Sequence, residues 1–117
     1  LLVKTGFGTY RFTDPAFYGN KNPGFAGETA EYLRESFPSL RAVGMDFPSA
    51  LSPAHIEDGL LFHTNALEPR GPDKTFLFLI EDMNLTDCTE SPVSLWVVPL
   101  FVEGIDSSPC TIIAEYP

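Results

Sequence analysis

Short apolar runs alternate with helix-favouring stretches along the first eighty residues. Residues 1–5, 41–46 and 76–80 are three short runs with strand character: the first and third are rich in Leu, Val, Ile and Phe, and the second contains Val43 and Met45. Residues 76–80 contain no polar position, which predicts a strand covered on both faces. In the second run, the alternation of side chains predicts that Val43 and Met45 point into the core.

The first helix is predicted over residues 28–35, which are mostly good helix formers. Ala30, Leu33 and Phe37 have the spacing that places them together on one helix face. Pro38 is expected to end the helix, because proline disfavours helical backbone in the residue before it.

A second helix is predicted over residues 55–67. Ser52 and Pro53 are the residue types preferred at an N-cap and in a first helical turn, which places the helix start there. Gly59 weakens this helix by about 1 kcal/mol relative to alanine.

Residues 6–24 are rich in Gly, Pro and Asn and predict a long loop that packs through its aromatic rings. The rings would form a local core, a ligand wall, or both. Residues 93–102 and 111–114 predict two further strands joined by a turn, with Pro99 marking a bend or an edge. The order of elements predicts one α/β domain, residues 1–117, with a mixed sheet and flanking helices.

The chain carries a formal net charge of -9, which disfavours nucleic acid and anionic membrane surfaces as partners. No apolar run is long enough for a membrane span, and the start does not have the pattern of a signal peptide. Cys88 and Cys110 form no C-x-x-C motif, and we expect both to be buried thiols. These features predict a cytoplasmic protein.

Candidate chemistry is concentrated in two histidines and two carboxylates. His55 and His63 lie roughly 12 Å apart on the second predicted helix, so one compact metal site does not hold both. His63 follows three apolar residues and could be a core histidine or a ligand. Glu81 and Asp82 follow a buried strand, where a carboxylate must be solvated, paired or ligated. His63 and Glu81 are ligand types suited to zinc or manganese.

Other common catalytic patterns are missing. The chain has no G-x-S-x-G elbow and no Gly-rich phosphate loop of the Walker or dinucleotide type. Neither cysteine has a base that the sequence identifies.

Five segments resemble motifs of the cyclase family of metal-dependent hydrolases, the kynurenine formamidase-like group, in that family's order. They are residues 1–7 (LLVKTGF), 22–25 (NPGF), 41–49 (RAVGMDFPS), 80–85 (IEDMNL) and 98–110 (VPLFVEGIDSSPC). The resemblance covers nearly all of the chain and corresponds to the C-terminal half of the family domain.

This resemblance implies a swivelling β/β/α fold and hydrolysis of an amide or cyclic amide by water activated on zinc or manganese. Substrates of such enzymes include N-formylkynurenine and isatin. The resemblance places His63 and Glu81 at the catalytic metal site, as ligands or proton carriers, and Thr5, Phe7 and Asp46 around the substrate pocket.

The family's N-terminal H-x-G-T-H-x-D-x-P-x-H segment, which supplies most ligands, has no counterpart here. Activity is therefore expected to need a complementing N-terminal segment. The alternative is a truncated, non-catalytic homologue that serves as an assembly or small-molecule-binding module. Either function predicts self-association into a homo-oligomer.

Overall fold

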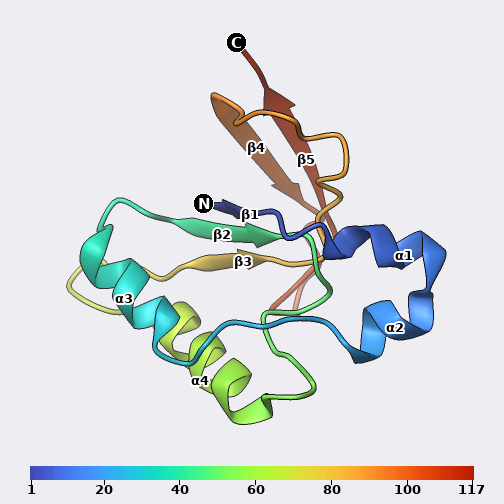
Figure 1. The fold of residues 1–117 in the computed structure, drawn as a ribbon. Coiled ribbons are helices and arrows are strands. Elements are labelled where there is room, and N and C mark those ends of the chain that lie inside the picture. Colours follow the sequence, from blue (N-terminus) through green and yellow to red (C-terminus); the bar gives the residue numbers. More distant parts are fainter. The chain divides into compact units, whose positions relative to one another are not determined.

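A three-stranded parallel sheet organises the larger of two compact units in this computed structural model, which describes residues 1–117. Its strands are β1 (Leu2–Val3), β2 (Ala42–Met45) and β3 (Phe78–Ile80), in the order β1-β2-β3 (Figure 1). The register is parallel on both sides of β2. The carboxyl ends of the strands therefore lie at one edge of the sheet, where α/β proteins place their sites.

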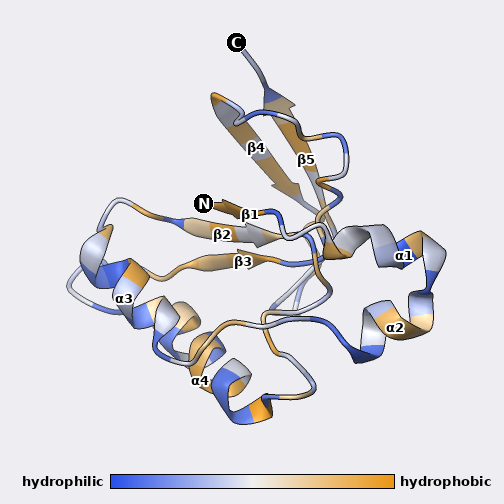
Figure 2. Ribbon diagram, in the orientation of Figure 1, coloured by the Kyte–Doolittle hydropathy of each residue, from blue (hydrophilic) through white to orange (hydrophobic).

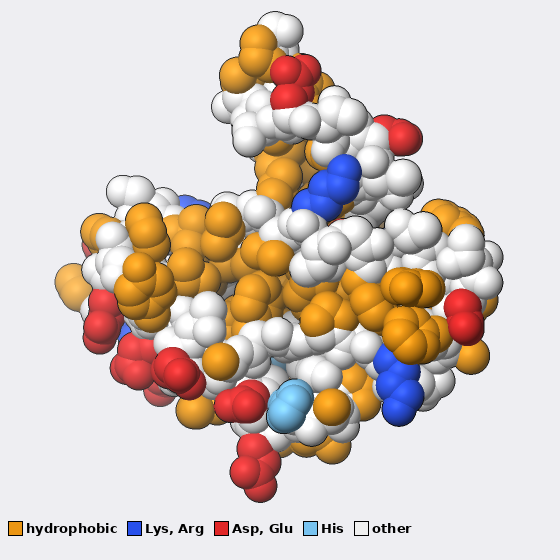
Figure 3. All heavy atoms as spheres, viewed as in Figure 1, with side chains coloured by type: hydrophobic (Ala, Val, Ile, Leu, Met, Phe, Trp, Pro, Cys, Tyr) orange, Lys and Arg blue, Asp and Glu red, His pale blue; other side chains and the backbone are white.

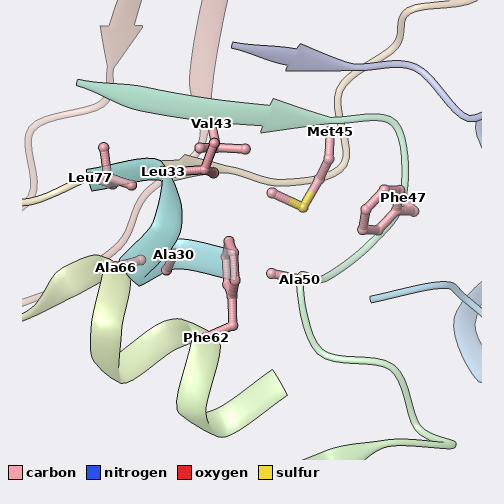
Figure 4. Packing of buried hydrophobic residues seen from close by; sticks show 9 residues of the cluster. All are labelled: Ala30, Leu33, Val43, Met45, Phe47, Ala50, Phe62, Ala66 and Leu77. Carbon is pink, nitrogen blue, oxygen red and sulfur yellow. The ribbon is translucent and has the colours of Figure 1, made fainter. Parts of the chain in front are cut away.

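Two helices cover one face of this sheet: α3 (Thr29–Ser36) and α4 (Ile56–Leu67) (Figure 1). Val43 and Met45 are fully buried beneath them, as predicted. Figure 4 shows how the side chains of this core meet between the sheet and the two helices. The buried cluster consists of Ala30, Leu33, Val43, Met45, Phe47, Ala50, Phe62, Ala66 and Leu77.

Three details of the predicted elements are wrong. Phe37 does not share the buried face of α3: it is 52% exposed, because the helix ends at Ser36 and its backbone leaves the helical conformation there. Phe78 is 58% exposed, because α3 and α4 cover only one face of the sheet, whereas the sequence predicted a strand covered on both faces. The N-cap of α4 is His55 and not Ser52, whose hydroxyl instead accepts a hydrogen bond from the backbone N–H of Ala54.

The predicted loop over residues 6–24 is largely helical. It contains the 3-10 turn η1 (Phe7–Thr9) and the short helices α1 (Tyr10–Thr13) and α2 (Pro15–Asn20). Asp14 caps α2 by accepting the N–H of Phe17, and a proline at the first helical position favours this start. The rings do pack together, as predicted. The ring contacts join Phe7, Tyr10, Phe17 and Tyr18.

The smaller unit, Cys88–Pro117, is a hairpin of β4 (Ser94–Pro99) and β5 (Cys110–Glu115). The strands are antiparallel, with Trp96 opposite Ile113, and both are largely hydrophobic (Figure 2). The five strands thus form two sheets, where the sequence predicted one mixed sheet. The α/β class itself is confirmed.

The two cysteines form no disulfide, and neither is fully buried. Cys110 is exposed, while Cys88 is half-buried with its Sγ 2.8 Å from the Tyr116 hydroxyl. The expectation of buried thiols is therefore wrong, because the hairpin has too few covering residues. None of the helices is both long and apolar enough to cross a lipid bilayer.

Candidate functional site

His63 and Glu81 lie together at the carboxyl edge of the parallel sheet. His63 projects from the middle of α4, and Glu81 follows the last residue of β3. The imidazole Nε2 is 3.3 Å from the carboxylate Oε1. Both side chains are about one-third exposed, so solvent and small ligands can reach the pair.

The backbone of α4 sets the orientation of the imidazole. His63 Nδ1 is 2.7 Å from the carbonyl oxygen of Gly59, one turn earlier in the helix. A carbonyl oxygen can only accept, so Nδ1 must carry a hydrogen. In the neutral ring this leaves Nε2 with a lone pair directed at Glu81. A lone pair facing a carboxylate is repulsive, and the contact becomes attractive only when a proton or a cation lies between the two groups.

Glu81 is held by the loop that follows β2. Its Oε1 accepts hydrogen bonds from the Ala50 backbone N–H at 2.7 Å and from the Ser49 hydroxyl at 3.1 Å. The same oxygen faces His63, while Oε2 accepts no hydrogen bond from the protein. One oxygen is therefore fixed and the other is available to a ligand.

Thr5, Phe7 and Asp46 form a separate group at the end of β1. The Asp46 carboxylate accepts from the Thr5 backbone N–H, from the Thr5 hydroxyl and from the Gly6 N–H, at 2.7–2.9 Å. Phe7 joins the group by donating its N–H to the Thr5 hydroxyl. None of the three forms a hydrogen bond with His63 or Glu81, and their place around a substrate pocket stays a prediction.

The environment of Asp46 favours its charged form. Burial opposes the charge, but the hydrogen bonds from Thr5, Gly6 and Gly8 outweigh burial and hold the pKa of the carboxyl below its ordinary value. Asp46 thus serves to fix the turn after β1 and has little capacity left for a ligand.

Asp82 belongs to a second cluster, whose other members the sequence did not reveal. Arg11 donates to Asp82 Oδ1 at 2.6 Å, and the Tyr18 hydroxyl donates to the same oxygen. Burial and this bond to Asp82 raise the pKa of Tyr18 to about 12. The three residues join the helices α1 and α2 to the end of β3. The only sequence signal was the position of Asp82 directly after a buried strand.

His55 lies apart from the pair, as its spacing predicted. It is exposed, its side chain makes no capping hydrogen bond, and it borders a shallow hollow of about 210 Å³ with Ser52 and Asp58. No group of three or more His, Cys, Asp or Glu side chains is arranged to hold a metal ion. His63 and Glu81 supply two candidate donors, one fewer than such a group needs.

The fold and site define an α/β unit with a half-buried imidazole–carboxylate pair at the carboxyl edge of a parallel sheet. The chain is similar to an uncharacterized protein of Haemophilus influenzae, with 41% identity over 44 residues. This match covers 38% of the chain and 31% of that relative, so the chain spans about a third of the relative's length. No family model and no solved structure matches the chain. The resemblance to the cyclase family therefore stays a prediction.

Proposed function

We propose that the protein is a metal-dependent hydrolase of amide bonds, related to the cyclase family and its swivelling β/β/α fold. One observation carries the proposal: His63 Nε2 and Glu81 Oε1 lie 3.3 Å apart although 18 residues separate them in the chain. The pairing forms at the edge of a parallel sheet where ligands bind in α/β proteins.

The donor chemistry fits a divalent cation. A neutral imidazole nitrogen and a carboxylate oxygen are ligand types for zinc and manganese. The hydrogen bond from His63 Nδ1–H to Gly59 O is the arrangement that orients metal-binding histidines, since it directs the lone pair of Nε2 outward. Two donors make a weak site, so the remaining ligands would come from outside residues 1–117, as the resemblance implies.

In this proposal a bound zinc or manganese ion supplies a polarised amide carbonyl and a water of lowered pKa. His63 is held in one tautomer by Gly59 and presents Nε2 to the ion. Glu81 Oε2 accepts a proton or contacts the ion, while Oε1 stays anchored on Ser49 and Ala50. The protein's own contribution is therefore to present two donors in a fixed orientation.

The test is a titration of the protein with zinc or manganese. We expect His63→Ala and Glu81→Gln to weaken binding strongly, because each removes one of two donors. His55→Ala is the matched control: it removes the other histidine, which is exposed and makes no capping bond, and binding should be unchanged. Equal binding by all four proteins would overturn the proposal.

Activity is tested on the native polypeptide that carries this sequence, with zinc or manganese added. Hydrolysis of N-formylkynurenine or isatin, followed by absorbance, should be lost in His63→Ala and retained in His55→Ala. Activity that survives His63→Ala would exclude this site as the catalytic centre.

A second candidate function is assembly, favoured by the hairpin. No residue of Cys88–Pro117 is buried, although its large hydrophobic side chains are numerous. Isolated two-stranded hairpins are at best marginally stable, so these side chains require a cover. The exposed ones are Val93, Trp96, Val97, Val98, Leu100, Phe101, Val102, Ile105, Ile113 and Tyr116.

The occupant that we propose is the hairpin of a second copy. Residues 91–102 carry no charge, so two copies can oppose these segments without like-charge repulsion. In sedimentation, the protein should self-associate, and Trp96→Lys should dissociate it because it places a charge at the centre of the apolar face. Glu103→Lys, outside both strands, should leave the association unchanged. A compact monomer at all concentrations would contradict this assignment.

A further inference from the structure

We propose that Asn22 is a positioning residue, which acts through residues 49–51 on the carboxylate of Glu81. The inference rests on the proposed metal site and adds to it the part of the chain that decides which oxygen of Glu81 is available. Asn22 forms no hydrogen bond with His63 or Glu81, so its effect passes through the loop between them.

The loop side that faces Glu81 consists of donors. The Ala50 N–H and the Ser49 hydroxyl both donate to Oε1. The Ser49 hydroxyl oxygen also accepts the N–H of Leu51 at 3.1 Å, which occupies one lone pair and restricts the direction of its hydrogen. Two directed donors on one carboxylate oxygen hold the group more firmly than either alone.

The opposite side of the same loop consists of carbonyls, and residues 22–25 bind all three. Asn22 Nδ2 donates to Ser49 O at 3.2 Å and to Leu51 O at 2.8 Å. The Phe25 N–H donates to Ala50 O at 3.0 Å. Because a peptide unit is planar, fixing each carbonyl also fixes the N–H of the next residue. The hydrogen bonds from residues 22–25 thus set the direction of the loop N–H groups, including that of Ala50, which donates to Glu81.

Burial makes these contacts rigid. Asn22 is only 4% exposed, and Pro23 O lies 2.9 Å from its amide nitrogen, so the two amide hydrogens are shared among three carbonyl acceptors. A buried amide without these acceptors is costly, so the arrangement has few alternatives. Gly24 allows the close approach: a Cβ there would lie 2.7 Å from Ala50 O and 2.6 Å from the Ser52 backbone nitrogen. Any side chain at position 24 would therefore force the backbone of residues 50–52 to move.

As a consequence, the two carboxylate oxygens of Glu81 have different surroundings. Oε1 is held by the two loop donors and faces His63 Nε2, so a cation between the two residues meets a carboxylate of fixed orientation, and Oε2 stays open to the same cation or to a proton. When the loop is released, Glu81 can rotate, both oxygens become equivalent, and the bound cation loses a donor placed in advance. Partners that orient a ligand in this way typically contribute 10- to 100-fold in metal affinity.

The experiment measures the affinity of the protein for zinc ion alone, by competition with a chromophoric chelator. Asn22→Ala and Ser49→Ala are each expected to weaken zinc binding roughly 10-fold. Ser49→Thr keeps the hydroxyl and should restore binding. Asn20→Ala is the matched control, because Asn20 is exposed and donates only to Ala16 O within α2.

The outcomes separate this inference from the proposed function. If His63→Ala and Glu81→Gln lose zinc while Asn22→Ala and Ser49→Ala bind like the wild type, the positioning role is wrong and the metal site stands. If none of the four affects binding, the metal site itself is wrong. Should Asn22→Ala fail to fold, Ser49→Ala and its rescue by Ser49→Thr decide the matter alone.

Discussion

Backbone donors determine how single carboxylates behave in this protein. Asp46 receives the N–H groups that follow β1, and Glu81 receives the N–H of Ala50 after β2. In both cases a loop after a parallel strand supplies the donors, and the residue that directly follows a neighbouring strand supplies the acceptor. The two acids differ in the number of oxygens left without a hydrogen bond: both oxygens of Asp46 accept hydrogen bonds, whereas Oε2 of Glu81 accepts none.

Asp46 should make stability depend on acid pH. The pKa of its carboxyl is lowered by folding, so its contribution is complete above the unfolded value of about 3.9 and is lost as the pH falls through the folded value. Asp46→Asn places an amide donor against N–H groups and should cost about 2 kcal/mol at pH 7. In urea unfolding, the difference from wild type should shrink below about pH 4. A difference independent of pH would contradict the charged role.

Tyr18 should act at the opposite end of the pH scale. Its pKa is raised to about 12, so the stability that it contributes is complete below pH 10 and is lost as the pH rises through 12. Ultraviolet titration should show a tyrosine that ionises near pH 12 and disappears in Tyr18→Phe. That variant should lose about 1 kcal/mol of unfolding free energy near neutral pH, since Arg11 and Asp82 lose a partner. Tyr32→Phe, at an exposed position, is the control.

At the scale of elements, the position of α4 depends on close packing against the loop after β2. A Cβ on Gly59 would lie 2.5 Å from the Cα of Leu51. The residue that weakens the helix by propensity is thus the one that lets α4 approach the loop and present His63 to Glu81.

Acidic side chains gather over the outer surfaces of α3 and α4 in Figure 3, consistent with the net charge of -9.

Gly59→Ala should therefore destabilise the protein despite the better helix propensity of alanine. The gain of about 1 kcal/mol from propensity is outweighed by overpacking, which typically costs about 1–3 kcal/mol. Gly19→Ala in α2 is the control, because a Cβ there meets nothing within 4 Å, and it should be neutral or slightly stabilising. Thermal unfolding of both variants measures the contrast. A more stable Gly59→Ala would show that the loop can yield.

At the scale of the whole molecule, the two units differ in how they are stabilised. Leu1–Asp87 contains every buried residue, whereas Cys88–Pro117 contains none and carries four acidic residues and no basic one. Cooperative unfolding depends on shared buried surface. The hairpin is therefore the part whose order is most sensitive to concentration and partners.

Trp96, the single tryptophan, allows this difference to be measured. Its fluorescence reports on the hairpin, while far-UV circular dichroism is dominated by the helices of Leu1–Asp87. We expect the fluorescence transition at a lower urea concentration than the dichroism transition, and a shift to higher urea as the protein concentration rises. Coincident transitions that do not depend on concentration would show one cooperative unit.

The sequence by itself determined the α/β class, the sheet strands β2 and β3 and both long helices, whereas it offered His63 and Glu81 only as candidates. These depend on hydrophobic periodicity and on residue type, which act locally and are visible in one chain. The separation of His55 from His63 was equally predictable, because the helical rise is constant.

The short helices within residues 6–24 were missed, because the stretch is rich in turn formers and only α2 has a side-chain cap, which Asp14 provides. The edge position of β3 and the split into two sheets are properties of strand pairing, which local pattern does not encode. Only the tertiary structure decided that Asn22 lies behind residues 49–51 and that Ala50 and Ser49 hold Glu81. Such contacts join segments about thirty residues apart, and a long-range hydrogen bond leaves no periodic trace in the sequence.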